Sequence, residues 1–160
     1  MKRILKLMIT IFIIIFLIII YARYIGTLGF NTKEYTINDK NIPEGFDGIK
    51  IVHFSDLHYN RAISLNKVAS IIDEINLINP DIVVFTGNLV DKDVTLSDKD
   101  FNDLTNLLLK INAKYGKYAV LGNHDIDYDI DKIIALYNES NFKYLDNDYD
   151  IIYNQKHEKV

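Results

Sequence analysis

The sequence predicts an α/β fold with a mainly parallel β-sheet, preceded by an N-terminal transmembrane helix. Two observations lead to this prediction. A long, almost purely apolar segment lies near the N-terminus, and from residue 49 onward short β-rich segments alternate with segments of helical periodicity. Alternation of strand, helix and strand is typical of βαβ units, which build parallel sheets.

The apolar segment 7–22 contains only two polar side-chain groups, the hydroxyls of Thr10 and Tyr21. Together with the apolar residues just before it, the segment approaches the ~20 residues that cross a bilayer as a helix. A buried core helix would carry a polar face, and the apolar part of a cleavable signal peptide is only ~7–15 residues long and ends at small residues. We therefore expect an uncleaved membrane anchor in residues 1–24 that contacts the lipid bilayer through residues 4–22.

The charges that flank the anchor predict its orientation. More basic residues precede the apolar segment than follow it closely: Lys2, Arg3 and Lys6 come before it, and Arg23 and Lys33 after it. Basic residues favour the cytoplasmic side of a membrane. We expect a single-pass protein with its N-terminus in the cytoplasm and the remaining chain outside. Residues 25–48 contain several glycines and a proline, which is typical of a tether without regular structure.

Residues 49–160 form the predicted domain. We expect strands at 49–54, 81–85 and 117–121, helices at 64–80, 97–111 and 129–140, and strand-like segments at 142–145 and 150–154. The strands have near-continuous Ile, Val and Leu content, which favours a sheet covered on both faces. Right-handed crossovers place the carboxyl ends of all strands at one edge, where such sheets bind ligands.

Composition excludes several classes of function. The formal net charge is −4, and no cluster of basic residues alternates with aromatic ones, so we expect no nucleic-acid partner. The chain has no cysteine, which excludes disulfides, thiolate metal sites and cysteine nucleophiles.

A polar turn follows each of the first three predicted strands. These turns contain Asp56 and His58, then Asn88 and Asp91, then Asn123, His124 and Asp125. Turns at strand ends are often rich in Asp and Asn without any site, so one such turn alone would indicate little. Three in succession at one edge predict a divalent-metal site, because carboxylate, imidazole and amide oxygen are ligands of such ions.

The passages that carry these turns read "FDGIKIVHFSDLH", "PDIVVFTGNLVD" and "YAVLGNHD". They resemble the calcineurin-like metallophosphoesterases, and are most similar to the membrane-anchored bacterial members related to enzymes that cleave the pyrophosphate of UDP-diacylglucosamine. The resemblance runs from Phe46 to Asp125 and more loosely to the end. It implies the first half of an αββα sandwich that hydrolyses phosphate ester or pyrophosphate bonds, with lipid-linked substrates among the candidates.

The resemblance also implies a role for each polar residue. Asp56 and His58 would hold the first of two divalent ions (Mn, Fe, Zn or Mg), residue 88 would bridge both ions, and Asn123 would bind the second. The ions would activate water and hold the phosphoryl oxygens.

His124 would protonate the leaving oxygen, and Asp125 would orient its ring. Asp91 is expected to brace its turn rather than to bind metal.

The sequence departs from the family pattern in two ways. The bridging position is an aspartate in the family, whereas this chain has Asn88. The family also completes its site with later histidines, including a G-H-x-H turn, and here only His157 follows His124. We therefore expect the N-terminal half of such a domain, with a weak second metal site and little or no phosphoesterase activity of its own. The alternative is a non-catalytic anchored remnant or binding module.

Overall fold

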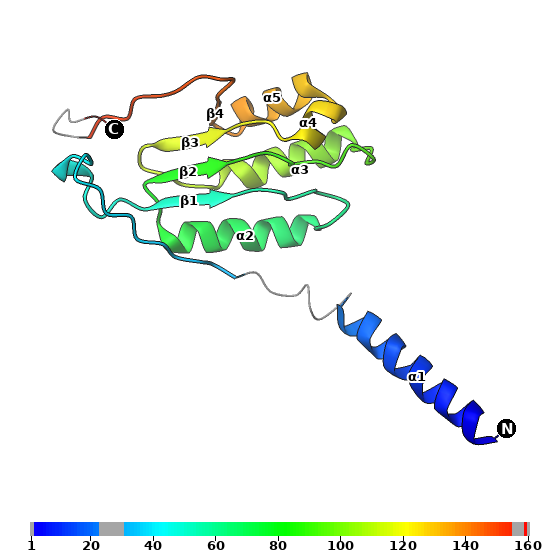
Figure 1. Cartoon of the computed structure of the whole chain (residues 1–160). Coiled ribbons are helices and arrows are strands. Elements are labelled where there is room, and N and C mark those ends of the chain that lie inside the picture. Colours follow the sequence, from blue (N-terminus) through cyan, green and yellow to red (C-terminus); the bar gives the residue numbers. More distant parts are fainter. Residues whose placement is uncertain (1, 23–30, 155–158, 160) are drawn as a thin grey trace. The chain divides into compact units, whose positions relative to one another are not determined.

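The computed structural model describes residues 2–22, 31–154 and 159, and the chain divides into two compact units, residues 1–37 and 38–160 (Figure 1). In the first unit, α1 spans Lys2–Ile20, and its part Arg3–Ile20 is long and apolar enough to cross a membrane. The hydroxyl of Thr10 donates to the Lys6 carbonyl (3.0 Å), so the helix itself satisfies this polar group, as a lipid environment requires. The predicted end of the anchor and the first part of the tether lie outside the described residues.

The second unit reaches further toward the N-terminus than the predicted boundary at residue 49. Residues 31–39 have no regular secondary structure, and the short 3-10 helix η2 spans Glu44–Phe46. Phe46 is buried, and its ring lies 5.9 Å from that of Tyr115. The last residues of the predicted tether therefore pack onto the domain.

A four-stranded parallel sheet forms the centre of the second unit, with its strands side by side in chain order (Figure 1). The strands are β1 (Ile51–Phe54), β2 (Ile82–Phe85), β3 (Gly116–Ala119) and β4 (Phe142–Tyr144). The predicted parallel α/β fold is confirmed. The predicted strand-like segment 150–154 forms no strand in the described part of the chain, where only Tyr153 makes an isolated bridge, to Lys159.

The helices of this unit are α2 (Leu65–Ile78), α3 (Asp98–Leu109), α4 (Asn123–Tyr128) and α5 (Ile130–Glu139). A capping box starts α3, in which the hydroxyl of Ser97 accepts from the Asp100 amide and the Asp100 carboxylate accepts from the Ser97 amide. The predicted helix 129–140 corresponds to α5, and α4 is an additional short helix. Asp129 separates the two because its extended backbone ends α4 while its side chain caps α5.

The apolar core lies on one face of the sheet. Helices α2, α3 and α5 share this core with alternate strand residues, namely Val52, Phe54, Val83, Phe85, Ala119 and Phe142. On the other face Ile51 is 57% exposed and His53 is also exposed. Ile82 of β2 lies on this second face and is only 5% exposed, so the face is open at the edge strand β1 rather than throughout. Coverage of both faces by helices is not confirmed for the described residues, because α2, α3 and α5 all share the core on the first face.

One lysine belongs to this core. Lys117 is only 7% exposed, and its ammonium donates to the carbonyls of Leu108 (3.0 Å) and Ser140 (2.7 Å) at the ends of α3 and α5. It also lies 4.9 Å above the Phe142 ring. Burial lowers the pKa of Lys117 to about 8.

Candidate metal centre

The three polar turns meet at the carboxyl edge of the sheet, as the sequence predicts. The Asp56 amide donates to the Gly87 carbonyl (3.0 Å) and the His58 amide to the Asn88 carbonyl (3.0 Å), which ties the β1 turn to the β2 turn. The His124 amide donates to the Asn88 side-chain oxygen (3.0 Å), which ties the β3 turn to the same residue. Asn88 is thus the point at which all three turns join.

Two glycines allow this close approach. Gly87 has a φ of +88°, and a Cβ placed on it would lie 2.1 Å from the Gly122 amide nitrogen. A Cβ on Gly122 would lie 2.2 Å from the side-chain oxygen of Asn88. Only glycine fits at either position, so the two Gly-Asn turns are built to touch each other.

Asp125 fastens the β2 turn to the start of α4. Its carboxylate is fully buried, and one oxygen accepts from the amides of Asn88 (2.7 Å) and Gly122 (2.9 Å). The other oxygen accepts from the Leu89 amide (2.8 Å). These bonds direct the carboxylate to the backbone, whereas the resemblance implies that it orients the His124 ring.

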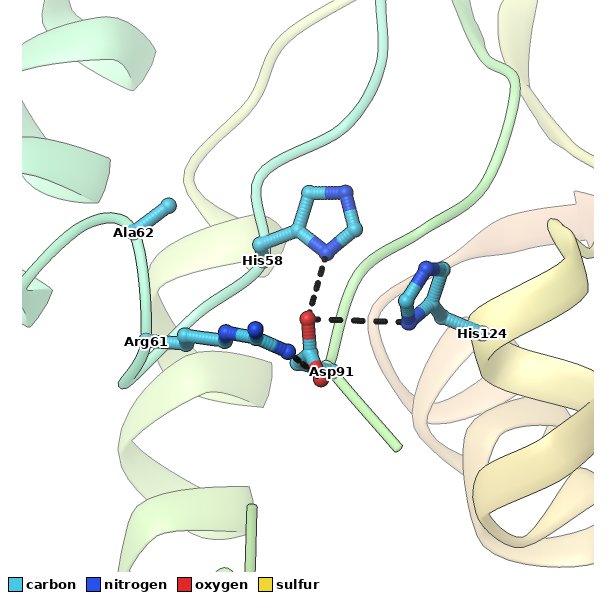
Figure 2. Close-up of a pocket in the computed structure, with 5 residues that line it drawn as sticks. All are labelled: His58, Arg61, Ala62, Asp91 and His124. Atoms are coloured by element: carbon cyan, nitrogen blue, oxygen red, sulfur yellow. Dashed lines mark hydrogen bonds and ion pairs between the residues drawn. The ribbon is translucent and has the colours of Figure 1, made fainter. Parts of the chain in front are cut away.

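The carboxylate that faces the His124 ring belongs to Asp91 (Figure 2). One Asp91 oxygen lies 3.5 Å from Nδ1 of His124 and 3.3 Å from Nδ1 of His58. Both nitrogens are buried, and neither has a hydrogen-bond partner of good geometry in the described structure. The rings stand edge to face with their centroids 4.8 Å apart. One buried carboxylate therefore serves two histidines from different turns.

Arg61 compensates the charge of this carboxylate. Its guanidinium donates to the other oxygen of Asp91 (2.6 Å) and to Asp93 (3.2 Å). Burial raises the pKa of Asp91, but the Asp93 amide and Arg61 outweigh this effect and leave the pKa below its usual value. Asp91 is thus held as a charged group. An open pocket of about 500 Å³ lies beside this ion pair, and it is lined by His58, Arg61, Ala62, Asp91 and His124 (Figure 2).

His58 lies between two carboxylates. Its Nε2 is 3.7 Å from Asp56 Oδ1, while its Nδ1 faces Asp91. The Ser55 hydroxyl and the Asn88 amide donate to Asp56 and lower its pKa. Both Asp56 (φ 56°) and His58 (φ 41°) have left-handed backbones, which is uncommon for residues other than glycine and concentrates at functional sites.

The remaining predicted ligands are Asn88 and Asn123. The side-chain nitrogen of Asn88 donates to Asp56 Oδ1 (2.8 Å). Asn123 is exposed and is the first residue of α4, next to His124. The structure thus brings Asp56, His58, Asn88 and His124 together at one place.

A family model described as calcineurin-like phosphoesterase matches residues 49–158. The chain belongs to this family. The resemblance inferred from the sequence is therefore confirmed, and the matched segment lies within the compact second unit.

Three relatives illustrate the range of phosphoesterases that the chain resembles. An uncharacterized metallophosphoesterase of Bacillus subtilis, YkuE, is 42% identical over 105 residues, which cover 66% of this chain and 36% of that protein. The UDP-2,3-diacylglucosamine pyrophosphatase LpxG of Chlamydia muridarum is 35% identical over 98 residues, covering 59% and 29%. A transmembrane protein with a metallophosphoesterase domain from Danio rerio is 30% identical over 86 residues, covering 54% and 19%. The matched part of the chain thus spans about a fifth to a third of these relatives. No solved structure gives a significant match.

This phosphoesterase family is metal-dependent, and the donors at the sheet edge fit one divalent ion. Asp56 Oδ1 and His58 Nε2 lie at a separation that two ligands of one ion can adopt with a small adjustment. Metal-binding histidines usually place the second ring nitrogen against a carboxylate, and Asp91 takes that position for His58. The ligand atoms of His58, Asp91 and His124 also lie within 4.8 Å of one another, which makes them a second candidate group for a metal.

The sequence did not predict the positions of two side chains that line the candidate site, those of Asp91 and Arg61. Asp91 was expected only to brace its turn, yet it faces both histidines, and its place three residues after Asn88 was the one available signal. Arg61 is the one arginine in residues 49–160, which was the available signal for it.

Proposed function

We propose that this protein is a metal-dependent phosphoesterase that hydrolyses phosphate ester or pyrophosphate bonds. The observation that carries the proposal is the position of His58, with one ring nitrogen next to Asp56 and the other facing the buried Asp91. This arrangement fixes the ring so that a single nitrogen remains for a metal ion.

Asp56 and His58 would hold the first ion, and the expected second ion would rest on Asn88 and Asn123. A bound divalent ion supplies positive charge that stabilises phosphoryl oxygens and makes water more acidic. Asp56 is suited to this role because hydrogen bonds from Ser55 and Asn88 keep its pKa low and its carboxylate charged. The second pair is less suited, because two neutral amides add no negative charge.

His124 would act as the general acid. Its Nδ1 faces Asp91, which favours a proton on that nitrogen and directs the other ring nitrogen away from the carboxylate. In the imidazolium form Nε2 also carries a proton, which it could donate to the leaving oxygen of a substrate bound in the pocket. Asp125 would support this role indirectly, because it fixes the amides on which the β2 and β3 turns depend.

We propose that the substrate is phosphorylated and lipid-linked, and that α1 anchors the domain at a membrane. Two observations support this part: the apolar segment Arg3–Ile20 and the similarity to a pyrophosphatase whose name specifies a diacylated substrate. From the flanking charges, the N-terminus would lie in the cytoplasm and the domain outside.

Mn²⁺ binding tests the proposal directly. The full chain in detergent should bind Mn²⁺ in a calorimetric titration, and His58→Ala should weaken that affinity by about 10-fold or more, since even outer-shell partners of a metal contribute 10–100-fold. His53→Ala is the matched control, because His53 is exposed on the open face of the sheet. No binding to the native chain, or equal loss in both variants, would refute a metal-dependent function.

Hydrolysis separates the phosphoesterase from the alternative of a non-catalytic binding module. With Mn²⁺ present, bis-p-nitrophenyl phosphate should be cleaved slowly by the native chain and at background rate by His124→Ala. Mn²⁺ binding without any turnover would instead support the binding module.

A further inference from the structure

We infer that Asn88 takes the place of a second ion in this chain: its amide joins the β1 turn to the start of α4 without metal, and the centre holds at most one divalent ion. The inference rests on the proposed metal-dependent function for the one ion that the centre would bind. The metal-free connection that Asn88 makes does not depend on that function.

Both ends of the Asn88 amide are engaged. The nitrogen donates to Asp56 Oδ1 at 2.8 Å, and the oxygen accepts from the His124 amide at 3.0 Å. The partners fix this orientation, because a reversed amide would place oxygen against the carboxylate and N–H against N–H. The residue therefore connects the Asp56 carboxylate to the start of α4 without an ion.

This arrangement is incompatible with a ligand that bridges two ions. The amide nitrogen carries two hydrogens and cannot coordinate a metal, and it is the atom that faces Asp56. Asp56 accepts from Asn88 at one oxygen and from the Ser55 hydroxyl at the other. A carboxylate oxygen has two acceptor sites, so Oδ1 can still serve one ion on the side of His58 Nε2.

The Asn88 side chain is also held in place by its surroundings. The backbone N–H of Asn88 donates to the Asp125 carboxylate, and the backbone carbonyl of Asn88 accepts from the His58 N–H. Its backbone is left-handed (φ 57°), and the space beside its oxygen is so small that Gly122 could not carry a Cβ. The side chain cannot turn to present its oxygen elsewhere without moving two turns.

The group of His58, Asp91 and His124 does not add a second ion site. Arg61 donates to Asp91 at 2.6 Å, so a positive charge already lies against this carboxylate. A dication bound to the neighbouring oxygen would be repelled by the guanidinium, and the charge of Asp91 is already compensated. We therefore assign this group to orientation of the two rings.

The first test uses the metal-free protein. In detergent with EDTA, Asn88→Asp places a second carboxylate against Asp56, so its unfolding midpoint should fall below that of the native chain by roughly 5–15 °C, more than in Asn88→Ala. Asn141→Asp is the matched control, because Asn141 is also an asparagine with positive φ (61°), is exposed, and precedes β4 at the other end of the sheet. Equal midpoints of Asn88→Asp and the native chain would overturn the inference.

A charge swap guards against a variant that simply folds poorly. The double variant Asp56→Asn, Asn88→Asp restores one amide facing one carboxylate, with the roles exchanged. It should recover at least half of the midpoint lost in Asn88→Asp when both are measured in EDTA. If the double variant is no more stable than Asn88→Asp, the contact between residues 56 and 88 is not what holds the turns together.

The second test counts ions. The native chain should bind no more than one Mn²⁺, whereas Asn88→Asp should bind two with the exchange-coupled electron paramagnetic resonance spectrum of neighbouring ions. Two coupled ions in the native chain would overturn the inference. If the native chain binds none while the metal-free comparisons behave as expected, the inference stands and the proposed metal-dependent function fails.

Discussion

Replacing Asp125 by asparagine tests how the candidate centre is held together. The Asp125 carboxylate is fully buried and accepts from four backbone amides, three at 2.7, 2.8 and 2.9 Å and that of Val90 at 3.4 Å. Asparagine keeps one oxygen and turns an NH₂ group toward amides that also donate. Hydrogen bonds to a charged group contribute about 1.5–3 kcal/mol each, so the loss of two bonds and the new contact between donors should lower the free energy of unfolding by about 3–5 kcal/mol. This is a large share of the roughly 5–15 kcal/mol that stabilises a typical domain.

The assay is chemical and thermal unfolding of the full chain in detergent with EDTA, so that no metal contributes. The unfolding midpoint of Asp125→Asn should fall by roughly 10–20 °C. Asp127→Asn is the matched control, because Asp127 is exposed on the same short helix. A loss of less than about 1 kcal/mol, or an equal loss in both variants, would refute the view that Asp125 acts through the backbone.

Three further predictions concern other parts of the chain. Burial lowers the pKa of Lys117 to about 8, so the unfolded state binds more protons than the folded state between pH 8 and 10. The free energy of unfolding, measured by urea titration at several pH values, should therefore rise across that window by up to about 3 kcal/mol. Lys117→Met should remove this rise. Gly122→Ala should lower the free energy of unfolding by about 1–3 kcal/mol in denaturant titration, because its Cβ would displace the Asn88 side chain. An unchanged free energy of unfolding would contradict the close approach of the two turns. Replacing Ile14 and Leu17 by arginine should release the chain from membranes in carbonate extraction, since each charge costs about 2.5–3.5 kcal/mol at a helix centre; retention in the pellet would contradict the anchor.

The sequence predicted the fold and the meeting of the turns because both follow from periodicity. Strand ends are marked by a change from apolar to polar residues, and parallel topology then places Asp56, Asn88 and His124 at one edge. The exposed face of the sheet was not predictable in this way. Strands such as Ile82–Phe85 are apolar at every position, so their sequence is the same whether one face or both faces are covered.

Side-chain partners within the turns were beyond sequence reasoning. Which carboxylate faces His124 depends on the path of the backbone after Asn88, whose positive φ turns the chain so that Asp91 points back toward the histidines. Asp125 lies next to His124 in sequence, but the first turn of α4 directs it to the unpaired amides at the helix start. Adjacency in sequence does not make two helical side chains neighbours, because successive helical residues point in different directions.

The strand order has a consequence for how the domain is made. Each strand pairs with the one synthesised just before it, so the sheet can grow from β1 to β4 as the chain leaves the ribosome, without a gap that waits for a later segment. Each parallel pairing must close a connection that contains a whole helix, so the pairing steps themselves are intrinsically slow. All residues of the candidate centre precede residue 126, so its three turns can close before α5 and β4 are added.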